Sequence, residues 1–356
     1  MNHYTLPSER DFEKYFEKLT SHLIILENKR GMAVALSDYG ARVVSILVPD
    51  KNGKKVDVAL GYNHIDEYLN SNERYHGATI GRFANRIAMG TFMVDENTYH
   101  IEPNNGTNAL HGGKTGFHDR VWSRRVNNRH QVDFYLVSPD GEDGFPGNLT
   151  VVVQYSLTDD NELRIHYRAH ADENTIINLT NHTYFNLNGE GGESIYNHQL
   201  TIDADSYLPV DSIQIPTGEF RPCKDSAFDF TSLKTIGEQI AMEDEQIKAA
   251  DGFDHNYVLN NATSQLQKPV AKILSPLTGI QMEVYTDQPG LQFYTGNFLS
   301  GNDTGKSGKP YLKHGAFCLE TQAFPDAPNH PAFPSCLLKV GDVFNSETRY
   351  RFNVVK

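Results

Sequence analysis

The chain is acidic: its 356 residues include 32 lysines and arginines against 45 aspartates and glutamates, which gives a formal net charge of −13 at pH 7. That balance makes nucleic acid and anionic membrane surfaces poor partners, while the length is sufficient for a full hydrophobic core. No apolar run approaches the ~20 residues of a membrane helix, and the first residues lack the basic and apolar segments of a signal peptide.

The cysteines indicate the compartment. Cys223, Cys318 and Cys336 are three in number and lie far apart in the chain. This usage suits a reducing environment better than a disulfide framework. We therefore expect a cytoplasmic protein. From the acidic charge we expect neither nucleic acid nor membrane among its partners, and the sequence leaves open whether the protein is a monomer or a homodimer.

The first predicted element is a short amphipathic helix. Apolar residues recur at helical spacing after Ser8, at Phe12, Tyr15, Phe16 and Leu19. A second helical pattern covers Leu233 to Met242. Helical patterns are otherwise few.

Short segments of alternating apolar and polar residues dominate the rest of the chain. They cover Met32–Leu36, Val43–Val48, Gln131–Val137, Leu149–Leu157, Leu163–Ala169 and Gln292–Phe298. Turn-forming residues such as Ser138–Gly141 separate them. Many short strands with frequent turns predict an all-β fold, a large antiparallel sandwich or barrel. No linker is long enough to divide it into two domains.

The stretch from Asn178 to Leu187 reads as a strand with one unusual face. Leu179, Phe185 and Leu187 point to one side, while the other carries amides, a hydroxyl, a phenol and the imidazole of His182. Such a polar face suits a ligand covered with hydroxyl groups. A lone histidine among neutral polar groups is a candidate proton donor. Most of the other polar side chains of this face are expected to orient His182 and to shape the site in which the ligand binds.

Several familiar motifs are absent or incomplete. Gly301–Ser307 resembles a phosphate-binding loop but has one residue too few between its glycines, so we interpret it as a surface loop. No Gly-x-Gly-x-x-Gly opens a helix, and no Gly-x-Ser-x-Gly elbow occurs. A metal site is the more serious alternative. Its candidate ligands are His111, His182, Asp254 and Glu320, but none of the common ligand spacings occurs, and we expect no intrinsic metal or cofactor.

Further short segments combine unusual polarity with strand-like or turn contexts. They are Gly81–Ile87, Asn108–Gly113, Asp251–Asn256, Gln288–Gly290 and Phe317–Gln322. In the last of these Phe317, Leu319 and Thr321 face one way, and Cys318, Glu320 and Gln322 the other. A carboxylate in an apolar strand is costly unless it is paired or needed. Glu320 is therefore a candidate base to set against His182 as the acid.

Each candidate also has an ordinary structural interpretation. His182 could be a satisfied strand histidine, and Glu320 could form a buried ion pair with Arg86. His111 could be a turn residue, and Asp254 could cap a turn. Arg82 is interpreted as structural. His118, His255, His314 and His330 are taken as surface or structural residues.

Taken together, these segments resemble the aldose 1-epimerase (galactose mutarotase) family. The strongest similarity lies in six segments that follow the family's order: Gly81–Phe92, Leu110–Gly113, Asn178–Leu187, Gly252–Asn256, Tyr285–Phe298 and Leu319–Asn329. The resemblance implies a galactose mutarotase-like β-supersandwich in residues 23–356, preceded by an N-terminal extension, residues 1–22. It also implies strand rather than helix between Phe12 and Leu26.

The resemblance further implies the roles of individual residues. Glu320 matches the family's general base and His182 its general acid. The residues that match the family's sugar-holding positions are Asn85, Arg86, His111, Asp254 and Gln288. The implied activity is interconversion of the α and β anomers of free hexoses such as galactose and glucose, without a cofactor. Two alternatives are a non-catalytic carbohydrate-binding module on the same fold and an epimerase of phosphorylated hexoses, which would require a more basic pocket.

Overall fold

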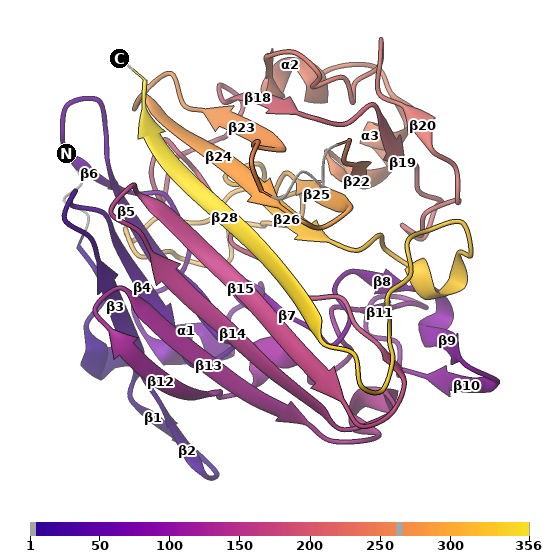
Figure 1. The fold of residues 1–356 in the computed structure, drawn as a ribbon. Coiled ribbons are helices and arrows are strands. Elements are labelled where there is room, and N and C mark those ends of the chain that lie inside the picture. Colours follow the sequence, from indigo (N-terminus) through magenta and orange to yellow (C-terminus); the bar gives the residue numbers. More distant parts are fainter. Residues whose placement is uncertain (1–4, 261–265, 356) are drawn as a thin grey trace.

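The computed structural model describes residues 5–260 and 266–355. A nine-stranded antiparallel sheet dominates it, and its long strands cross the front of the molecule in Figure 1. In spatial order its strands are β12 (Ser123–Asn128), β13 (Gln131–Ser138), β14 (Leu149–Leu157), β15 (Glu162–Ala171), β28 (Phe344–Val354), β24 (Ile280–Thr286), β23 (Ala271–Leu274), β18 (Gln199–Ile202) and β21 (Lys234–Thr235). The predicted all-β architecture with large antiparallel sheets is confirmed.

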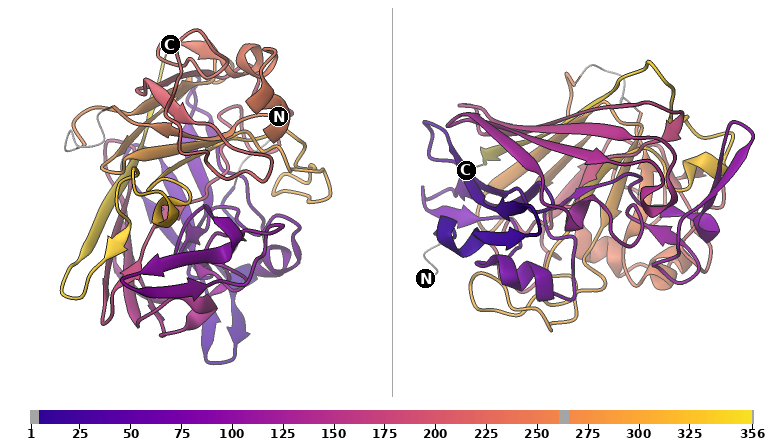
Figure 2. Two further views of the ribbon diagram at one scale, coloured as in Figure 1. Left: turned by 90° about the vertical axis from the view of Figure 1, so that its right-hand side faces the viewer. Right: turned by 90° about the horizontal axis from the view of Figure 1, so that it is seen from below.

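Two smaller antiparallel sheets lie behind the large one. The five-stranded sheet has the order β20 (Arg221–Pro222), β19 (Ser206–Leu208), β22 (Asp254–Val258), β25 (Gly290–Tyr294) and β26 (Cys318–Gln322). The four-stranded sheet has the order β3 (Leu23–Glu27), β4 (Ala33–Ser37), β5 (Arg42–Pro49) and β6 (Lys55–Asp57). Seen from below, the long strands run along one side of the molecule and the short helices lie on the other (Figure 2).

The remaining elements are short. Within the described residues, five two-stranded pairs join β1 (Lys14–Phe16) to β2 (Leu19–Ser21), β9 (Thr91–Val94) to β10 (Asn97–His100), β8 (Arg86–Ile87) to β11 (Ala109–Leu110), β16 (Thr175–Ile176) to β27 (Leu337–Leu338), and β7 (Thr79–Ile80) to β17 (Thr180–Asn181). The α-helices in the described residues are α1 (Ile65–Asn70), α2 (Ile236–Ile240) and α3 (Glu245–Ala250). The 3₁₀ turns are η1 (Glu9–Phe12), η2 (Ala88–Gly90), η3 (Phe117–Asp119), η4 (Glu142–Gly144) and η5 (Ala327–Asn329). None of these helices has the length and apolar character needed to cross a bilayer.

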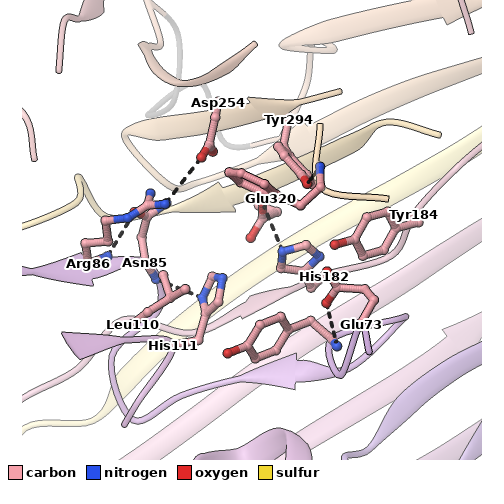
Figure 3. Close-up of a pocket in the computed structure, with 12 residues that line it drawn as sticks. Glu73, Asn85, Arg86, Leu110, His111, His182, Tyr184, Asp254, Tyr294 and Glu320 are labelled. Carbon is pink, nitrogen blue, oxygen red and sulfur yellow. Dashed lines mark hydrogen bonds and ion pairs between the residues drawn. The ribbon is translucent and has the colours of Figure 1, made fainter. Parts of the chain in front are cut away.

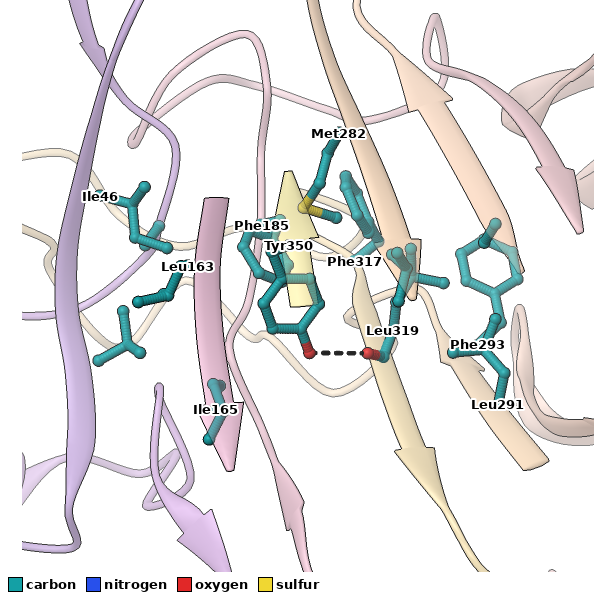
Figure 4. Packing of buried hydrophobic residues seen from close by; sticks show 14 of the residues in the cluster. Ile46, Leu163, Ile165, Phe185, Met282, Leu291, Phe293, Phe317, Leu319 and Tyr350 are labelled. Atoms are coloured by element: carbon teal, nitrogen blue, oxygen red, sulfur yellow. Dashed lines mark hydrogen bonds between the residues drawn. The ribbon is translucent and has the colours of Figure 1, made fainter. Parts of the chain in front are cut away.

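The core fills the space between the large sheet and the strands behind it. Buried and partly exposed residues alternate along the whole of β14, as expected for a sheet with one face turned to the core. From the opposite layer Phe293, Phe317 and Leu319 project into the same apolar cluster (Figure 4). The Tyr350 hydroxyl donates to the carbonyl of Leu319 at 3.1 Å, which ties β28 to β26. Burial of these side chains is the main favourable term for the fold.

The first helix prediction is wrong, and the second is right only for its central residues. Lys14–Phe16 and Leu19–Ser21 pair as an antiparallel hairpin rather than a helix, with Glu17 at a positive φ of 38° in the turn. The Ser21 hydroxyl donates to the carbonyl of Phe12 at 2.7 Å, which fixes the start of this hairpin. The second pattern does contain a helix, but Lys234–Thr235 is paired as β21 and only Ile236–Ile240 is helical.

The predicted strand over 178–187 is regular only at Thr180–Asn181. Isolated bridges at Asn178 and Phe185 replace a continuous ladder. The cause is local, because Asn181 Oδ1 accepts from the backbone of Thr183 at 3.2 Å, and such bonds compete with sheet pairing. The predicted facing of the side chains nevertheless holds for the apolar residues Leu179, Phe185 and Leu187, which lie in the core.

The loop over 301–307 is not purely a surface feature. Lys306 reaches inward and forms an ion pair with Asp57, with 2.8 Å between Nζ and Oδ2. The same ammonium group donates to the carbonyls of Val44 at 2.6 Å and Ala59 at 2.9 Å. Lys306 therefore anchors this loop to the four-stranded sheet and does not bind phosphate.

Candidate active site

A cavity of about 420 Å³, open to solvent, lies where the five-stranded sheet meets the 178–187 segment. All the predicted site residues except Gln288 line it: Asn85, Arg86, His111, His182, Asp254 and Glu320. The other lining residues are Glu73, Tyr75, Leu110, Tyr184, Tyr294 and Phe298. Its mixture of aromatic and polar walls is typical of small-molecule sites.

His182 and Glu320 face each other inside this cavity (Figure 3). His182 Nε2 lies 3.7 Å from Glu320 Oε1, and both side chains are almost fully buried. Glu320 Oε2 has no hydrogen-bond partner among the described residues. Burial raises the pKa of Glu320 well above its usual value, and the charge of Asp254 raises it further. Burial lowers the pKa of His182 to about 4.

Three neighbouring strands of the five-stranded sheet supply one wall of the site. Glu320 on β26 lies opposite Gln292 on β25, and β22 next to β25 carries Asp254. Gln292 Nε2 donates to Asp254 Oδ1 at 2.7 Å. The opposite faces of these strands pack in the core, as the alternation in Phe317–Gln322 predicts. One sheet therefore holds a row of polar groups in fixed positions.

The β8–β11 pair supplies a second wall. Leu110 pairs with Arg86 in its ladder, which brings His111 beside Asn85. Arg86 Nη2 lies 3.5 Å from Asp254 Oδ2, so its ion pair is with Asp254 and not with Glu320. His111 Nδ1 accepts from the backbone N–H of Asn85 at 3.2 Å. In the neutral ring the proton is then on Nε2, which can donate to a ligand.

The first glycine after His111 lies against another segment of the backbone. A Cβ on Gly112, whose φ is +87°, would lie 1.9 Å from the carbonyl oxygen of Gly81. Two backbone segments therefore approach each other closely at this glycine. This close approach holds the loop that carries His111 against the loop that leads to Asn85.

The neighbours of His182 fix the orientation of its ring. Tyr184 packs on it with 4.9 Å between ring centroids, and Tyr75 stacks on it at 5.7 Å. Asn181 points away from the cavity and donates to the carbonyl of Gly77 at 2.8 Å. His182 Nδ1 faces the Cys318 thiol at 3.5 Å. Of the polar face predicted here, His182 and Tyr184 line the cavity.

The structure does not bring Gln288 to this site. Its backbone N–H donates to Thr286 at 3.0 Å in the turn before β25, and its side chain borders a separate hollow beside Ser335 and Phe344. The glutamine that lies beside Asp254 and Glu320 is Gln292, which the prediction missed. The signal was the same as for Glu320, namely a polar residue inside an apolar strand.

Other residues have structural roles. The buried guanidinium of Arg82 donates to the carbonyls of Pro146 at 2.7 Å and Ser138 at 3.1 Å, in agreement with its structural interpretation. His118 and His255 are fully buried and lie outside the lining of the cavity. Glu73 does line the cavity, but it comes from an irregular loop whose sequence shows no pattern that could have identified it.

The site also contains possible metal ligands. One ligand atom each from His111, His182 and Glu320 lie within 4.8 Å of one another. Three of the four residues considered from the sequence are thus close enough to share a cation. The same three groups are equally suited to exchanging protons with a ligand.

A buried carboxylate beside an imidazole, within a polar cavity on a large antiparallel β-sandwich, defines an acid–base enzyme. Comparison with known proteins agrees: residues 22–351 match the model of the aldose 1-epimerase family. The chain is 46% identical to galactose mutarotase of Bos taurus over 323 residues, 91% of this chain and 92% of that protein. It is 42% identical to aldose 1-epimerase of Escherichia coli over 332 residues, 93% and 94% of the two chains.

Solved structures support the same assignment. An aldose epimerase homologue from C. elegans superposes with a TM-score of 0.87 at 33% identity, covering 94% of this chain and all of that one. Galactose 1-epimerase from Lactobacillus acidophilus superposes with a TM-score of 0.85 at 29% identity, covering 96% and 97% of the two chains. The chain belongs to the aldose 1-epimerase family.

Proposed function

We propose that the protein interconverts the α and β anomers of free aldohexoses, galactose and glucose among them, with Glu320 as base and His182 as acid. The observation that carries this proposal is the separation of 3.7 Å between Glu320 Oε1 and His182 Nε2 inside an open cavity. An acid and a base this close can serve the C1 hydroxyl and the ring oxygen of one pyranose, since both oxygens are bonded to C1.

The reaction is a pair of proton transfers. Glu320 takes the proton of the C1 hydroxyl while His182 gives one to the ring oxygen, and the bond between C1 and that oxygen breaks to leave an aldehyde. Rotation about C1–C2 exposes the other face of the aldehyde. The C5 oxygen then attacks C1, its proton returns to His182, and the new C1 oxygen recovers the proton held by Glu320. Each transfer contributes roughly 10²–10⁴ in rate.

Burial biases where the shared proton resides. It favours a neutral His182 and a protonated Glu320, because it raises the pKa of the carboxyl and lowers that of the imidazole. A neutral His182 and a protonated Glu320 are the protonation states that the two side chains have after ring opening. The buried environment therefore stabilises the stage of the reaction in which the open-chain sugar is bound, and a single proton on the pair supports both directions.

The sugar is held by groups outside the proton-transfer pair. Arg86 donates from Nε to Asn105 at 3.1 Å, and its other nitrogens lie toward Asp254 and the cavity. Sugar hydroxyls can donate to Asp254 and accept from Arg86 and from His111 Nε2. Fixing the pyranose in this way adds an orientation term to the rate.

A cytoplasmic location is supported by the three free, buried cysteines.

Polarimetry tests this function directly. Freshly dissolved α-D-galactose and α-D-glucose should approach their equilibrium rotation faster with the protein than without it. Glu320→Gln should lower kcat by roughly 10²-fold or more, because an amide is no base. A wild-type protein that leaves the spontaneous rate unchanged for every aldose contradicts the proposed function. A fully active Glu320→Gln variant contradicts the assignment of the base alone.

A further inference from the structure

The cavity contains a carboxylate that the acid–base reaction does not use. Glu73 lines it from the loop between α1 and β7, on the far side of His182 from Asp254 (Figure 3). Glu73 Oε1 accepts from the backbone N–H of Tyr75 at 3.0 Å, and its side chain also shares a hydrogen bond with Tyr184. Burial raises the pKa of Glu73, and no ion pair with a basic side chain of the described residues balances its charge.

Hydrogen bonds to a loop distant in the sequence hold the backbone of Glu73 in place. Asp303, on the loop that Lys306 anchors, accepts from the backbone N–H groups of Asn72 at 3.0 Å and Glu73 at 3.1 Å. The side-chain amide of Asn72 donates to the same carboxylate at 2.9 Å. A half-buried carboxylate with few partners is costly to maintain. Because a carboxylate has about four acceptor positions, Glu73 retains the capacity to accept from a ligand.

The order of the side chains indicates which part of a sugar Glu73 meets. Along the wall, Asp254 is followed by Glu320, His182, Tyr184 and Glu73. On a pyranose, the C2 hydroxyl, the C1 hydroxyl, the ring oxygen and the C5 hydroxymethyl follow one another around the ring. If Glu320 serves the C1 hydroxyl and His182 the ring oxygen, the next substituent beyond His182 is the hydroxymethyl. Glu73 is the charged acceptor on that side.

We propose that Glu73 is a specificity-determining residue that accepts a hydrogen bond from the C6 hydroxyl of a neutral hexose. The inference rests on the proposed function and names the substrate class of that site. It means that the protein favours hexoses with a free C6 hydroxyl over pentoses and 6-deoxy sugars. A negative charge at the same place also disfavours sugars with a phosphate or carboxylate at C6.

The test compares D-galactose with D-fucose, its 6-deoxy analogue, by polarimetric kcat/KM. One hydrogen bond to a charged group corresponds to roughly a 10- to 100-fold preference for galactose in the wild type. Glu73→Ala should remove most of this preference by lowering kcat/KM for galactose while leaving D-fucose within about 2-fold. Asn72→Ala is the matched control, because it loses a contact in the same loop outside the cavity and should keep the preference.

A second variant guards against misfolding. Glu73→Gln retains an oxygen for the Tyr75 N–H and removes the charge, so it should fold and should raise kcat/KM for D-galactose 6-phosphate relative to the wild type. Equal losses on galactose and D-fucose in Glu73→Ala, or an unchanged preference, would overturn the proposal. A wild type that accelerates both sugars without preference overturns this inference alone. A wild type that accelerates neither, nor any other aldose, overturns the proposed function as well.

Discussion

Replacing Lys306 by methionine should destabilise the protein, although Lys306 itself does not line the cavity. Lys306 Nζ lies 2.8 Å from Asp57 Oδ2, and the two side chains are 6% and 2% exposed. The variant leaves the carboxylate buried without its cation, and breaking such a pair costs about 3–5 kcal/mol. At about 2.1 cal/mol/K per residue, the unfolding entropy of a chain this long is about 0.75 kcal/mol/K. The expected fall in Tm is therefore about 4–7 °C.

Differential scanning calorimetry measures this effect against a matched control. Lys309→Met changes an exposed lysine of the same loop and should shift Tm by less than about 1 °C. Adding Asp57→Asn to Lys306→Met should recover about half of the loss, because the amide oxygen still accepts from the backbone of Ile46 while the charge is gone. A Lys306→Met variant as stable as Lys309→Met would show that the buried ion pair does not anchor this loop.

Three further predictions concern catalysis. The His182–Glu320 pair needs one proton to work. As the pH drops through about 4, both groups become protonated and kcat/KM should fall. On the alkaline side kcat/KM should fall where Glu320 loses its proton, at a pH well above the usual pKa of a glutamate. Asp254→Asn should move the alkaline fall in kcat/KM to lower pH, since the charge of Asp254 raises the pKa of Glu320. An alkaline fall that moves to higher pH or stays in place contradicts this electrostatic account. Gln292→Ala should raise KM for galactose by roughly 10-fold, because it removes a partner of Asp254. Gln288→Ala, in the turn before the same strand, should leave KM unchanged, and the reverse result would restore Gln288 to the site.

Alternation identified the parts of the site that lie on regular strands. In β26 the period of two separates Glu320 from the core residues Phe317 and Leu319, and the sequence alone was sufficient to place it. The same rule assigned His182 to the correct side, although asparagine side chains bond locally and break up the strand that was predicted there. Periodicity is therefore a better guide to which way a side chain faces than to how long a strand is.

Turns and loops were less predictable, because long-range contacts decide where they lie. Gln288 and Gln292 lie four residues apart, which is two periods of a β-strand, so alternation alone gives both the same facing. Only the register of β25 with β26 shows which of them lies beside Glu320. Glu73 is in a loop held by Asp303, far away in the sequence. The N-terminal apolar residues fit a helix equally well by spacing, but Tyr15 is 70% exposed and its neighbours pair as a hairpin. The division of the chain at residue 22 stays a prediction.

The position of β28 has a consequence for how the chain folds. This last strand of the sequence is inserted between β15 and β24, in the middle of the largest sheet. During synthesis β15 emerges long before its partner, and at the usual rate of translation its edge stays open for on the order of ten seconds or more. Open edges invite pairing with other chains. Completion of the sheet therefore waits for synthesis of Phe344–Val354, and a chain that lacks this strand loses the centre of its main sheet rather than a dispensable edge.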